Sequence, residues 1–253
     1  MKQPRLRVFA GANGSGKSTL NSVIDKKLLG QYINADDMEK SIKEIGYLDF
    51  SLYQITVLEN DLFAFLNNHT LIEKANLQNE VKKLSVKNNK LFFTDISLNS
   101  YYTSVCADYI RHKLLENKIS FTFETVMSFP DKIDFLEKAK KSGYRVYLYY
   151  ISTQDPIINI SRVENRVKNG GHNVPKDKIE SRYYRSLKLL SSAVKHTDRA
   201  YIFDNSVGTS INDRVWILEI TDAKRIKFKT DTLPLWINEY LIDIKEKVMT
   251  KVY

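Results

Sequence analysis

Residues 11–19 read Gly11-Ala12-Asn13-Gly14-Ser15-Gly16-Lys17-Ser18-Thr19. Residues 11–18 fit the pattern GxxxxGK[ST], which is typical of phosphate-binding loops. Glycines permit backbone angles and close approaches that a side chain blocks, so successive N–H groups can turn toward phosphate oxygens. An apolar run from Arg5 to Ala10 precedes the loop, and helical spacing resumes after it through Leu20, Val23 and Ile24. This order of strand, loop and helix is the context in which the pattern indicates a nucleotide site.

We therefore predict that residues 11–19 bind ATP together with Mg2+. In such loops the lysine bridges the β- and γ-phosphates, and the serine hydroxyl binds the metal ion. These roles are predicted for Lys17 and Ser18. The alternative is a flexible glycine turn that binds nothing.

Short apolar runs recur along the chain and are separated by amphipathic stretches long enough for crossover helices. They lie at Gln31 to Ala35, Ser120 to Val126, Tyr144 to Ser152 and Ala200 to Phe203. Alternation of this kind favours an α/β fold, and we predict a doubly wound parallel sheet of the P-loop NTPase type.

The C-terminal part and the middle of the chain depart from this alternation. Two strand-like runs, Trp216 to Thr221 and Arg225 to Lys229, predict a β-hairpin, and a closing helix is expected at about Trp236 to Val248. The segment from Leu48 to Tyr101 has a long helix-like stretch and is predicted to be a helical insertion. A crossover helix is expected from Tyr101 to Leu115. We assign residues 1–253 to a single domain that contains the insertion.

Composition limits the class of protein. The 253 residues are 43% hydrophobic and 27% charged, which is ordinary for a globular chain. No stretch approaches the roughly 20 apolar residues of a membrane span, and the polar N-terminus has no signal core. One cysteine, Cys106, fits a reducing compartment, so we expect a cytoplasmic protein without membrane partners. The net charge of +9 attracts polyanions without selecting one, or reflects Lys-rich surfaces, and we do not expect nucleic acid as the main partner.

A pair of aspartates, Asp36 and Asp37, follows the second predicted strand. Ligands of such sheets bind outside the carboxyl ends of the strands, so a carboxylate here can face the phosphate loop. Asp36 could accept the proton of a substrate hydroxyl and orient it for in-line transfer. Alternatively, either aspartate simply caps the helix that begins near Met38.

A glutamate, Glu124, ends the third predicted strand. A carboxylate that ends a buried strand is costly unless it is solvated, paired or bound to a ligand, which favours a functional role for Glu124. Thr125 and Ser128 follow it and could orient substrate oxygens.

Two pairs of arginines flank a glycine loop, Gly170 to Pro175. Arg162 and Arg166 precede the loop at helical spacing, and Arg182 and Arg185 follow it. A mobile loop beside arginines is typical of a lid that brings positive charge to a transferring phosphate, although either pair could be ordinary surface arginines. His172 within the loop is interpreted as a loop or substrate contact, because no second histidine lies at metal-ligand spacing.

Together these pieces resemble the zeta toxin family of P-loop kinases. The resemblance rests on GANGSGKST at 11–19, INADD at 33–37, FETVMS at 123–128 and RVENRVKNGGHNVPKDKIESRYYRS at 162–186. Phe203-Asp204-Asn205-Ser206 resembles the strand and turn that close the family's nucleotide site.

The resemblance implies a kinase that phosphorylates UDP-N-acetylglucosamine at the 3′-hydroxyl of the amino sugar, as the toxin of a toxin and antitoxin pair. It assigns the acceptor's base to Asp36, acceptor binding to Glu124 and Thr125, and phosphate contact to Arg162. The position of the family's second lid arginine falls near His172 here. The role of that arginine is therefore left to Arg166, Arg182 or Arg185.

Two other functions remain open at this point. One is a kinase for another hydroxyl, such as that of a nucleoside, a dinucleotide or a polynucleotide end. The other is a nucleotide-switched binding module that hydrolyses ATP slowly and acts through a partner protein.

Overall fold

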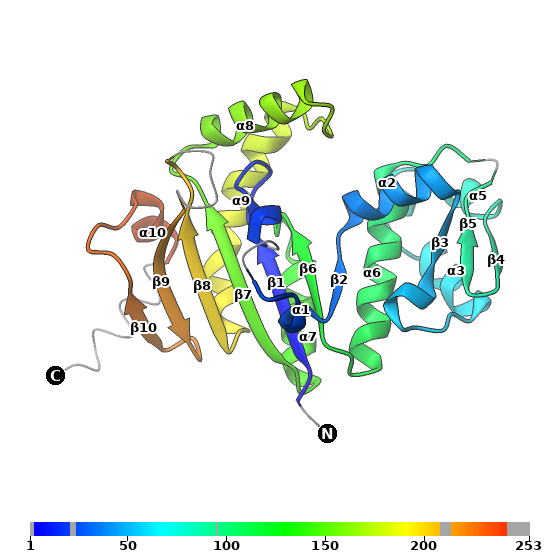
Figure 1. Ribbon diagram of the computed structural model, residues 1–253, viewed down its shortest axis with the longest axis horizontal. Coiled ribbons are helices and arrows are strands. Elements are labelled where there is room, and N and C mark those ends of the chain that lie inside the picture. The colour runs from blue at the N-terminus through cyan, green and yellow to red at the C-terminus, as the bar shows by residue number, and fades with distance from the viewer. Residues whose placement is uncertain (1–2, 21–23, 95, 208–213, 242–253) are drawn as a thin grey trace. The chain divides into compact units, whose positions relative to one another are not determined.

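A computed structural model describes residues 3–20, 24–94, 96–207 and 214–241. The chain forms two compact units (Figure 1). The larger unit comprises Met1–Gly30 and Thr122–Tyr253, and the smaller unit comprises Gln31–Phe121. Within the described part of the chain, no helix combines the length and apolar character needed to cross a bilayer.

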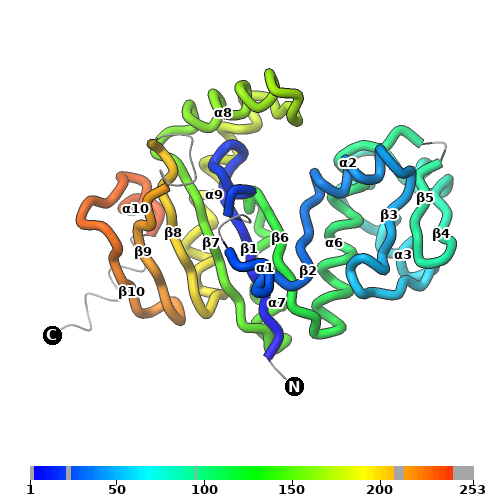
Figure 2. The backbone as a smooth tube through the Cα atoms, in the orientation of Figure 1, coloured from blue at the N-terminus to red at the C-terminus, as the bar shows by residue number. Residues whose placement is uncertain are grey.

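A twisted sheet is the centre of the larger unit. Six of the sheet's seven strands are, in spatial order, β10 (Arg225–Phe228), β9 (Val215–Thr221), β8 (Arg199–Asp204), β7 (Arg145–Ser152), β1 (Arg5–Ala10) and β6 (Phe121–Thr125), and β2 (Gln31–Ile33) is the seventh. β1 pairs with β7 and β7 pairs with β8 in parallel, whereas β8, β9 and β10 pair antiparallel. Figure 2 shows β1, β7 and β8 side by side. The predicted α/β class with a largely parallel sheet and a C-terminal hairpin is confirmed.

Burial explains why these segments form central strands. In β1 all residues from Leu6 to Ala10 are buried, as expected for a strand covered on both faces. One face of β7, with Val146, Leu148 and Tyr150, is also fully buried. Two helices pack in this core, α7 (Asp131–Lys141) against β7 and α9 (Lys176–Lys195) against α7. α8 (Pro156–Lys168) in turn packs on α9.

The predicted closing helix is only partly described. α10 spans Leu235–Tyr240 and packs against α9. Residues 242–248 of the predicted helix lie outside the described residues.

The smaller unit is built around one long helix, α6 (Ser100–Glu116), which confirms the helix predicted from Tyr101 to Leu115. Around it lie β2 (Gln31–Ile33), α2 (Ala35–Ile45), β3 (Tyr47–Asp49), the 3-10 helix η2 (Phe50–Tyr53), α3 (Glu59–Asn67), α4 (Thr70–Lys74), α5 (Gln78–Val81), β4 (Ser85–Lys87) and β5 (Lys90–Phe92). The predicted insertion, residues 48–101, falls within this unit. Its boundaries and the single-domain assignment stay predictions.

The expectation of a long helix in that segment is wrong. The segment instead contains three short helices, α3 to α5, and most of an antiparallel sheet of order β3-β5-β4. β4 and β5 are joined by Asn88 and Asn89, both with positive φ (51° and 61°). Two consecutive left-handed residues make the tight turn that suits a β-hairpin, and asparagine tolerates that conformation better than most residues. The asparagine pair was the signal that the helical interpretation overlooked.

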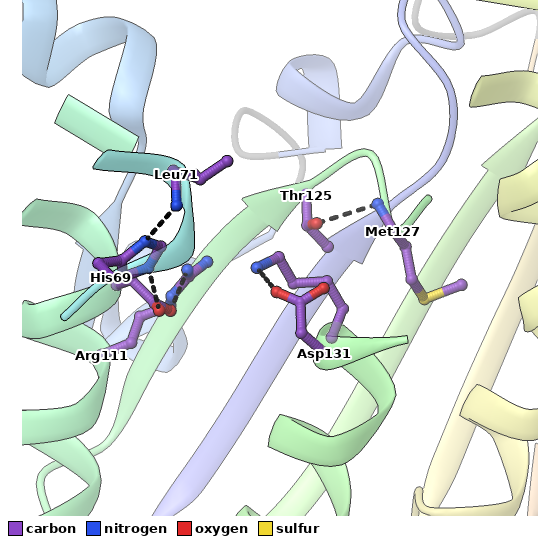
Figure 3. A network of polar contacts seen from close by, with 8 residues as sticks. His69, Leu71, Arg111, Thr125, Met127 and Asp131 are labelled. Atoms are coloured by element: carbon purple, nitrogen blue, oxygen red, sulfur yellow. Dashed lines mark hydrogen bonds and ion pairs between the residues drawn. The ribbon is translucent and has the colours of Figure 1, made fainter. Parts of the chain in front are cut away.

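A histidine organises part of this unit. The Nδ1 atom of His69 accepts a hydrogen bond from the N–H of Leu71 (3.1 Å), which caps α4 (Figure 3). The Nε2 atom lies 3.2 Å from Asp108, whose carboxylate also pairs with the buried Arg111. Because Nδ1 accepts, the proton of the neutral ring belongs on Nε2, and Asp108 fixes this tautomer.

The hairpin turn between β9 and β10 generates a stability prediction. Asp222 and Ala223 have φ values of 54° and 53°, a conformation that costs an alanine about 1–2 kcal/mol. Ala223→Gly relieves this cost, partly offset by the greater unfolded-state entropy of glycine. We expect a net gain of about 0.5–1 kcal/mol and a melting temperature higher by about 1–3 °C in a thermal denaturation scan.

The reciprocal variant is Gly143→Ala. Gly143 has φ +83° and open space around its Cα, so an added methyl group is strained without colliding. Its melting temperature should fall. A lower melting temperature for Ala223→Gly would show that the turn tolerates alanine without strain.

Candidate functional site

The phosphate loop joins β1 to a 3-10 helix, η1 (Lys17–Leu20). Residues 21–23 lie outside the described residues, the N–H of Ile24 donates to the carbonyl of Leu20 (3.2 Å), and α1 spans Lys26–Leu29. The predicted order of strand and loop is thus confirmed. The helix that follows is described only in these short pieces.

Each of the three loop glycines lies so close to a neighbouring residue that a side chain would collide with it. Gly11, Gly14 and Gly16 have φ values of +143°, +78° and +97°. A Cβ at these positions would lie 2.0 Å from the carbonyl oxygen of Ile151, 2.5 Å from that of Asn159 and 2.5 Å from Nδ2 of Asn205. Real Cβ atoms do not approach other atoms so closely, so only glycine fits, and the loop is clamped against β7, α8 and the end of β8.

Two side-chain amides hold the loop from outside. Asn159, fully buried on α8, donates from Nδ2 to the carbonyl of Asn13 (2.7 Å). Asn205, just after β8, donates from Nδ2 to the carbonyl of Ser15 (2.8 Å). A carbonyl oxygen would repel a phosphate, so amides that engage these carbonyls on the outside favour a loop shaped for an anion.

The segment after β8 is itself anchored by a buried carboxylate. Asp204 accepts hydrogen bonds from the N–H of Ser206 (2.9 Å) and from Nε1 of Trp236 on α10 (2.8 Å). The predicted closing segment at 203–206 therefore contacts the phosphate loop through Asn205. Sequence analysis did not identify Asn159, because nothing in the sequence of α8 distinguishes a buried asparagine from an exposed one.

Lys17 folds back over its own loop. Its Nζ donates to the carbonyls of Gly11 (2.7 Å) and Ala12 (2.8 Å). A lysine that bridges phosphates must exchange at least part of these contacts for phosphate oxygens. Next to it, Thr19 donates to the carbonyl of Gly16 (2.6 Å) and accepts from Arg214.

Arg214 is a further residue that sequence analysis missed. Burial lowers the pKa of its guanidinium, which marks a cation held in a poorly solvated place beside the loop. Arg214 follows a segment that contains no recognisable motif, so nothing in the sequence indicated that this arginine lies at the loop.

The four predicted lid arginines separate into two kinds. Arg182 donates to Oδ1 of Asn13 in the phosphate loop (3.3 Å). Burial lowers the pKa of Arg162, and the nearby charge of Asp204 opposes this shift. Arg182 therefore reaches the phosphate loop, whereas Arg162 lies near Asp204, which anchors the segment after β8.

The other two arginines, both exposed, contact residues outside the phosphate loop. Arg166 donates to the carbonyl of His172 (2.7 Å) and shapes the glycine loop between α8 and α9. Arg185 lies over the ring of Phe129, 4.7 Å from its centroid. The i, i+4 and i, i+3 pairs that the sequence grouped together are thus divided by the structure.

The end of β6 combines a carboxylate with a strained turn. Glu124 accepts a hydrogen bond from the hydroxyl of Ser18 (2.9 Å). The hydroxyl of Thr125 accepts from the N–H of Met127 (3.0 Å), as Figure 3 shows, and Met127 is buried with φ at 52°. Thr125 thus stabilises an unfavourable backbone conformation, and Ser128 is buried beyond it. Strain of this kind concentrates at functional sites.

Asp36 and Asp37 lie in the smaller unit, in the first turn of α2. The cap of this helix is Asn34, whose Oδ1 accepts from the N–H groups of Asp36 (2.9 Å) and Asp37 (3.4 Å). The alternative that either aspartate caps the helix is therefore wrong, because the preceding asparagine does so. Partial burial and the charge of Asp36 raise the pKa of Asp37. The role of Asp36 as a base stays a prediction.

Metal binding at the site would depend on few protein ligands. No cluster of three or more His, Cys, Asp or Glu side chains suited to a metal occurs in the part of the chain that the structure describes. His172 is exposed in the loop, where its carbonyl contacts Arg166.

Comparison with known proteins gives a family match for part of the chain. The profile of the family described as Zeta toxin matches residues 99–215. This range includes Glu124, the four lid arginines and Asp204, and it begins after the phosphate loop and Asp36.

Other known proteins resemble this chain in sequence or in fold. An uncharacterised protein of Haemophilus influenzae is 35% identical over 72 residues, which are 28% of this chain and 51% of that protein. The crystal structure of AvrRxo1-ORF1 with AvrRxo1-ORF2 and sulphate ions has a TM-score of 0.53 at 13% identity, covering 90% of this chain and 62% of that one. The same pair with ATP gives a TM-score of 0.52 at 14% identity, covering 99% and 65%.

These relatives are longer than the matched part of this chain, which spans about half the length of the Haemophilus protein and less than two thirds of AvrRxo1-ORF1. The structural likeness concerns the fold. Residues 99–215 thus match the zeta toxin family, and the chain shares the fold of AvrRxo1-ORF1.

Proposed function

We propose that the chain is an ATP-dependent kinase that transfers the γ-phosphoryl group to a hydroxyl of a small molecule. The phosphate loop carries this proposal, because its three glycines and the amides of Asn159 and Asn205 build a cradle that a nucleotide triphosphate fits. The ATP complex of AvrRxo1-ORF1 supports the choice of nucleotide.

The residues at the loop also suit Mg2+. The hydroxyl of Ser18 and the carboxylate of Glu124 are the oxygen ligands that this ion prefers. When bound, the ion neutralises charge on the phosphates. Lys17 moves from the carbonyls of Gly11 and Ala12 onto the phosphates, while Arg182 and Arg162 supply positive charge from the helices beside the loop.

For the acceptor we propose UDP-N-acetylglucosamine, phosphorylated at the 3′-hydroxyl of its amino sugar. The match to the zeta toxin family supports this choice, and Asp36 in the INADD segment is the proposed base that orients the hydroxyl. A nucleoside, a dinucleotide or a polynucleotide end are the competing acceptors.

We further propose that the protein is a cytoplasmic toxin that a small antitoxin protein restrains. The family supports this, as does the complex that AvrRxo1-ORF1 forms with AvrRxo1-ORF2. ATP and nucleotide sugars are the substrates that such an enzyme would find in the cytoplasm.

Removal of the lysine tests the phosphotransfer itself. Lys17→Ala should lower kcat about 10²–10³-fold, because a preorganised charge at the transferring phosphate is lost. Transfer of label from ATP to UDP-N-acetylglucosamine with Mg2+ measures this. The matched control is Lys188→Ala on the exposed side of α9. Induced expression should slow bacterial growth with the wild type and the control, and equal toxicity of Lys17→Ala would refute phosphotransfer as the cause.

Variants of Asp36 and of its neighbour Asp37 test the proposed general base. Asp36→Asn should lower kcat about 10²–10⁴-fold with little change in the KM for ATP, because a general base is lost. Asp37→Asn, one residue further in the same helical turn, is the control and should retain most activity. Equal losses in both variants would indicate a structural effect on α2, and full activity of Asp36→Asn would remove Asp36 from the mechanism.

The different contacts of Arg182 and Arg185 give a third test. Arg182→Ala should lower kcat about 10²-fold, because its guanidinium reaches the phosphate loop. Arg185→Ala, on the same helix but over Phe129, should change kcat by less than about twofold. Steady-state rates at saturating ATP distinguish the two. The reverse order of losses would assign the lid role to Arg185.

A further inference from the structure

One side of the sheet in the larger unit is left partly open. α9 covers the other side, where the hydroxyl of the buried Tyr150 on β7 lies 3.0 Å from that of Ser186. Side chains alternate along a strand, so Tyr147 and Tyr149 point away from α9, and both are only partly buried. Figure 1 shows β7 and β8 in front of α9, with no described helix drawn over their near side. We call the side that carries Tyr147, Tyr149 and Tyr201 the tyrosine face.

Strand register arranges the aromatic residues of this face in rows. Tyr149 on β7 is opposite Tyr201 on β8, and their rings stack with centroids 4.8 Å apart. Phe203 on β8 is opposite Trp216 on β9, and these rings also stack, with centroids 6.3 Å apart. Trp216 is 37% exposed, whereas tryptophan is usually well buried in a folded chain. The tyrosine face therefore presents a large apolar ring to solvent.

Two of the rings are accompanied by cations. The guanidinium of Arg145 lies 5.6 Å from the centroid of Tyr147, and the ammonium of Lys229 lies 4.0 Å from that of Trp216. Such cations are attracted to the negative face of the ring, and the attraction is weak where solvent reaches it. An anion that binds the cation can therefore draw it away and free the ring for another planar group.

Positive charge exceeds negative charge on this face. Glu219 is the only carboxylate that β7, β8, β9 and β10 direct to this side, and it lies 3.3 Å from Arg199 and 3.9 Å from Lys229. At the edge, Asp222 in the hairpin turn pairs with Arg225 (2.8 Å). The exposed and partly exposed cations of the face are Arg145, Arg199, Arg225, Lys227 and Lys229.

This composition fits a single-stranded nucleic acid better than an acidic protein. Interfaces with nucleic acid are much more positively charged than interfaces between proteins, in which lysine is depleted. A single strand combines phosphates, which bind cations, with unpaired bases, which stack on aromatic rings. Sheets that bind RNA offer two or three aromatic rings on one face in this way.

We propose that the tyrosine face binds single-stranded nucleic acid without sequence preference. Lys229 and Arg145 turn from their rings to phosphates, and bases stack on the faces of Trp216 and Tyr147 that the cations leave. Composition alone did not favour this partner, because a net charge of +9 does not select a polyanion. The position of the cations among exposed aromatic rings does so. The inference requires neither ATP nor phosphotransfer.

A salt titration tests the phosphate contacts. The full chain is titrated against labelled oligothymidylate and oligouridylate of about 20 nucleotides by fluorescence anisotropy, from about 50 to 200 mM KCl. The double variant Lys227→Gln, Lys229→Gln should weaken binding about tenfold at the lower salt. The slope of log K against log salt should become shallower by about 1.4, because each cation on a single strand contributes about 0.7.

The matched control changes the same net charge on the other side of the sheet. Lys188→Gln, Lys195→Gln replaces two exposed lysines of α9 and should keep the affinity and the salt slope of the wild type. Equal losses in the two double variants would overturn the proposal, because total charge and not the tyrosine face would then explain the binding.

A tryptophan variant tests the stacking. Trp216→Leu should weaken binding about 5–100-fold without changing the salt slope, because a base loses its ring and no cation is removed. Oligonucleotide should quench tryptophan fluorescence in the wild type but not in Trp216→Leu, since the other tryptophan, Trp236, is buried. If Trp216→Leu does not fold, the quenching in the wild type decides. Absence of quenching in the wild type, or full affinity of the folded variant, would overturn the proposal.

Competitors separate this face from other sites and partners. Mg·ATP should leave oligonucleotide binding unchanged, whereas displacement by Mg·ATP would place the strand at the phosphate loop and overturn the proposal. Poly-glutamate that binds more tightly than the oligonucleotides, through the same lysines, would indicate an acidic protein partner and overturn it as well. Failure to bind either oligonucleotide would refute this inference and leave the phosphotransfer proposal standing, because Lys17→Ala tests that separately.

Discussion

The approach of the phosphate loop to its neighbours is the constraint on which the rest of the site depends. The carbonyl of Ile151 at the end of β7 leaves no room for a Cβ at Gly11, and Asn159 and Asn205 hold the outer carbonyls of the loop. The end of β7, α8 and the segment after β8 thus converge on one turn of backbone. Because the contacts are made to backbone atoms, they specify the shape of the loop rather than its side chains.

This clamp also explains how the two helices beside the loop are aligned. Asn159 lies one helical turn before Arg162 on α8, and its side-chain amide is hydrogen-bonded to the loop. Arg182 reaches the same residue of the loop, Asn13, from α9. Arginines therefore come to the loop on helices whose positions are already determined by packing and by buried hydrogen bonds. A long cationic side chain on such a fixed helix is positioned more precisely. It also loses less conformational freedom when it binds.

Polar contacts at the ends of β6 and β8 play complementary parts. At β8, Asp204 is buried and receives two hydrogen bonds, so the following turn is rigid where Asn205 touches the loop. At β6, the turn through Met127 is strained and presents Glu124 to Ser18. One strand end stabilises the cradle, whereas the other offers a carboxylate to whatever the cradle binds.

Local sequence determined the strands of the larger unit, the glycine loop and the helix α6, because alternating burial, positive φ angles and helical periodicity are properties of neighbouring residues. It also placed the four arginines on the right helices. It could not tell Arg182 from Arg185, or pair Glu124 with Ser18, because those distinctions depend on which way a helix turns and which strands are neighbours. Only the tertiary structure decides contacts between segments separated by more than a hundred residues, and these contacts are what make the site.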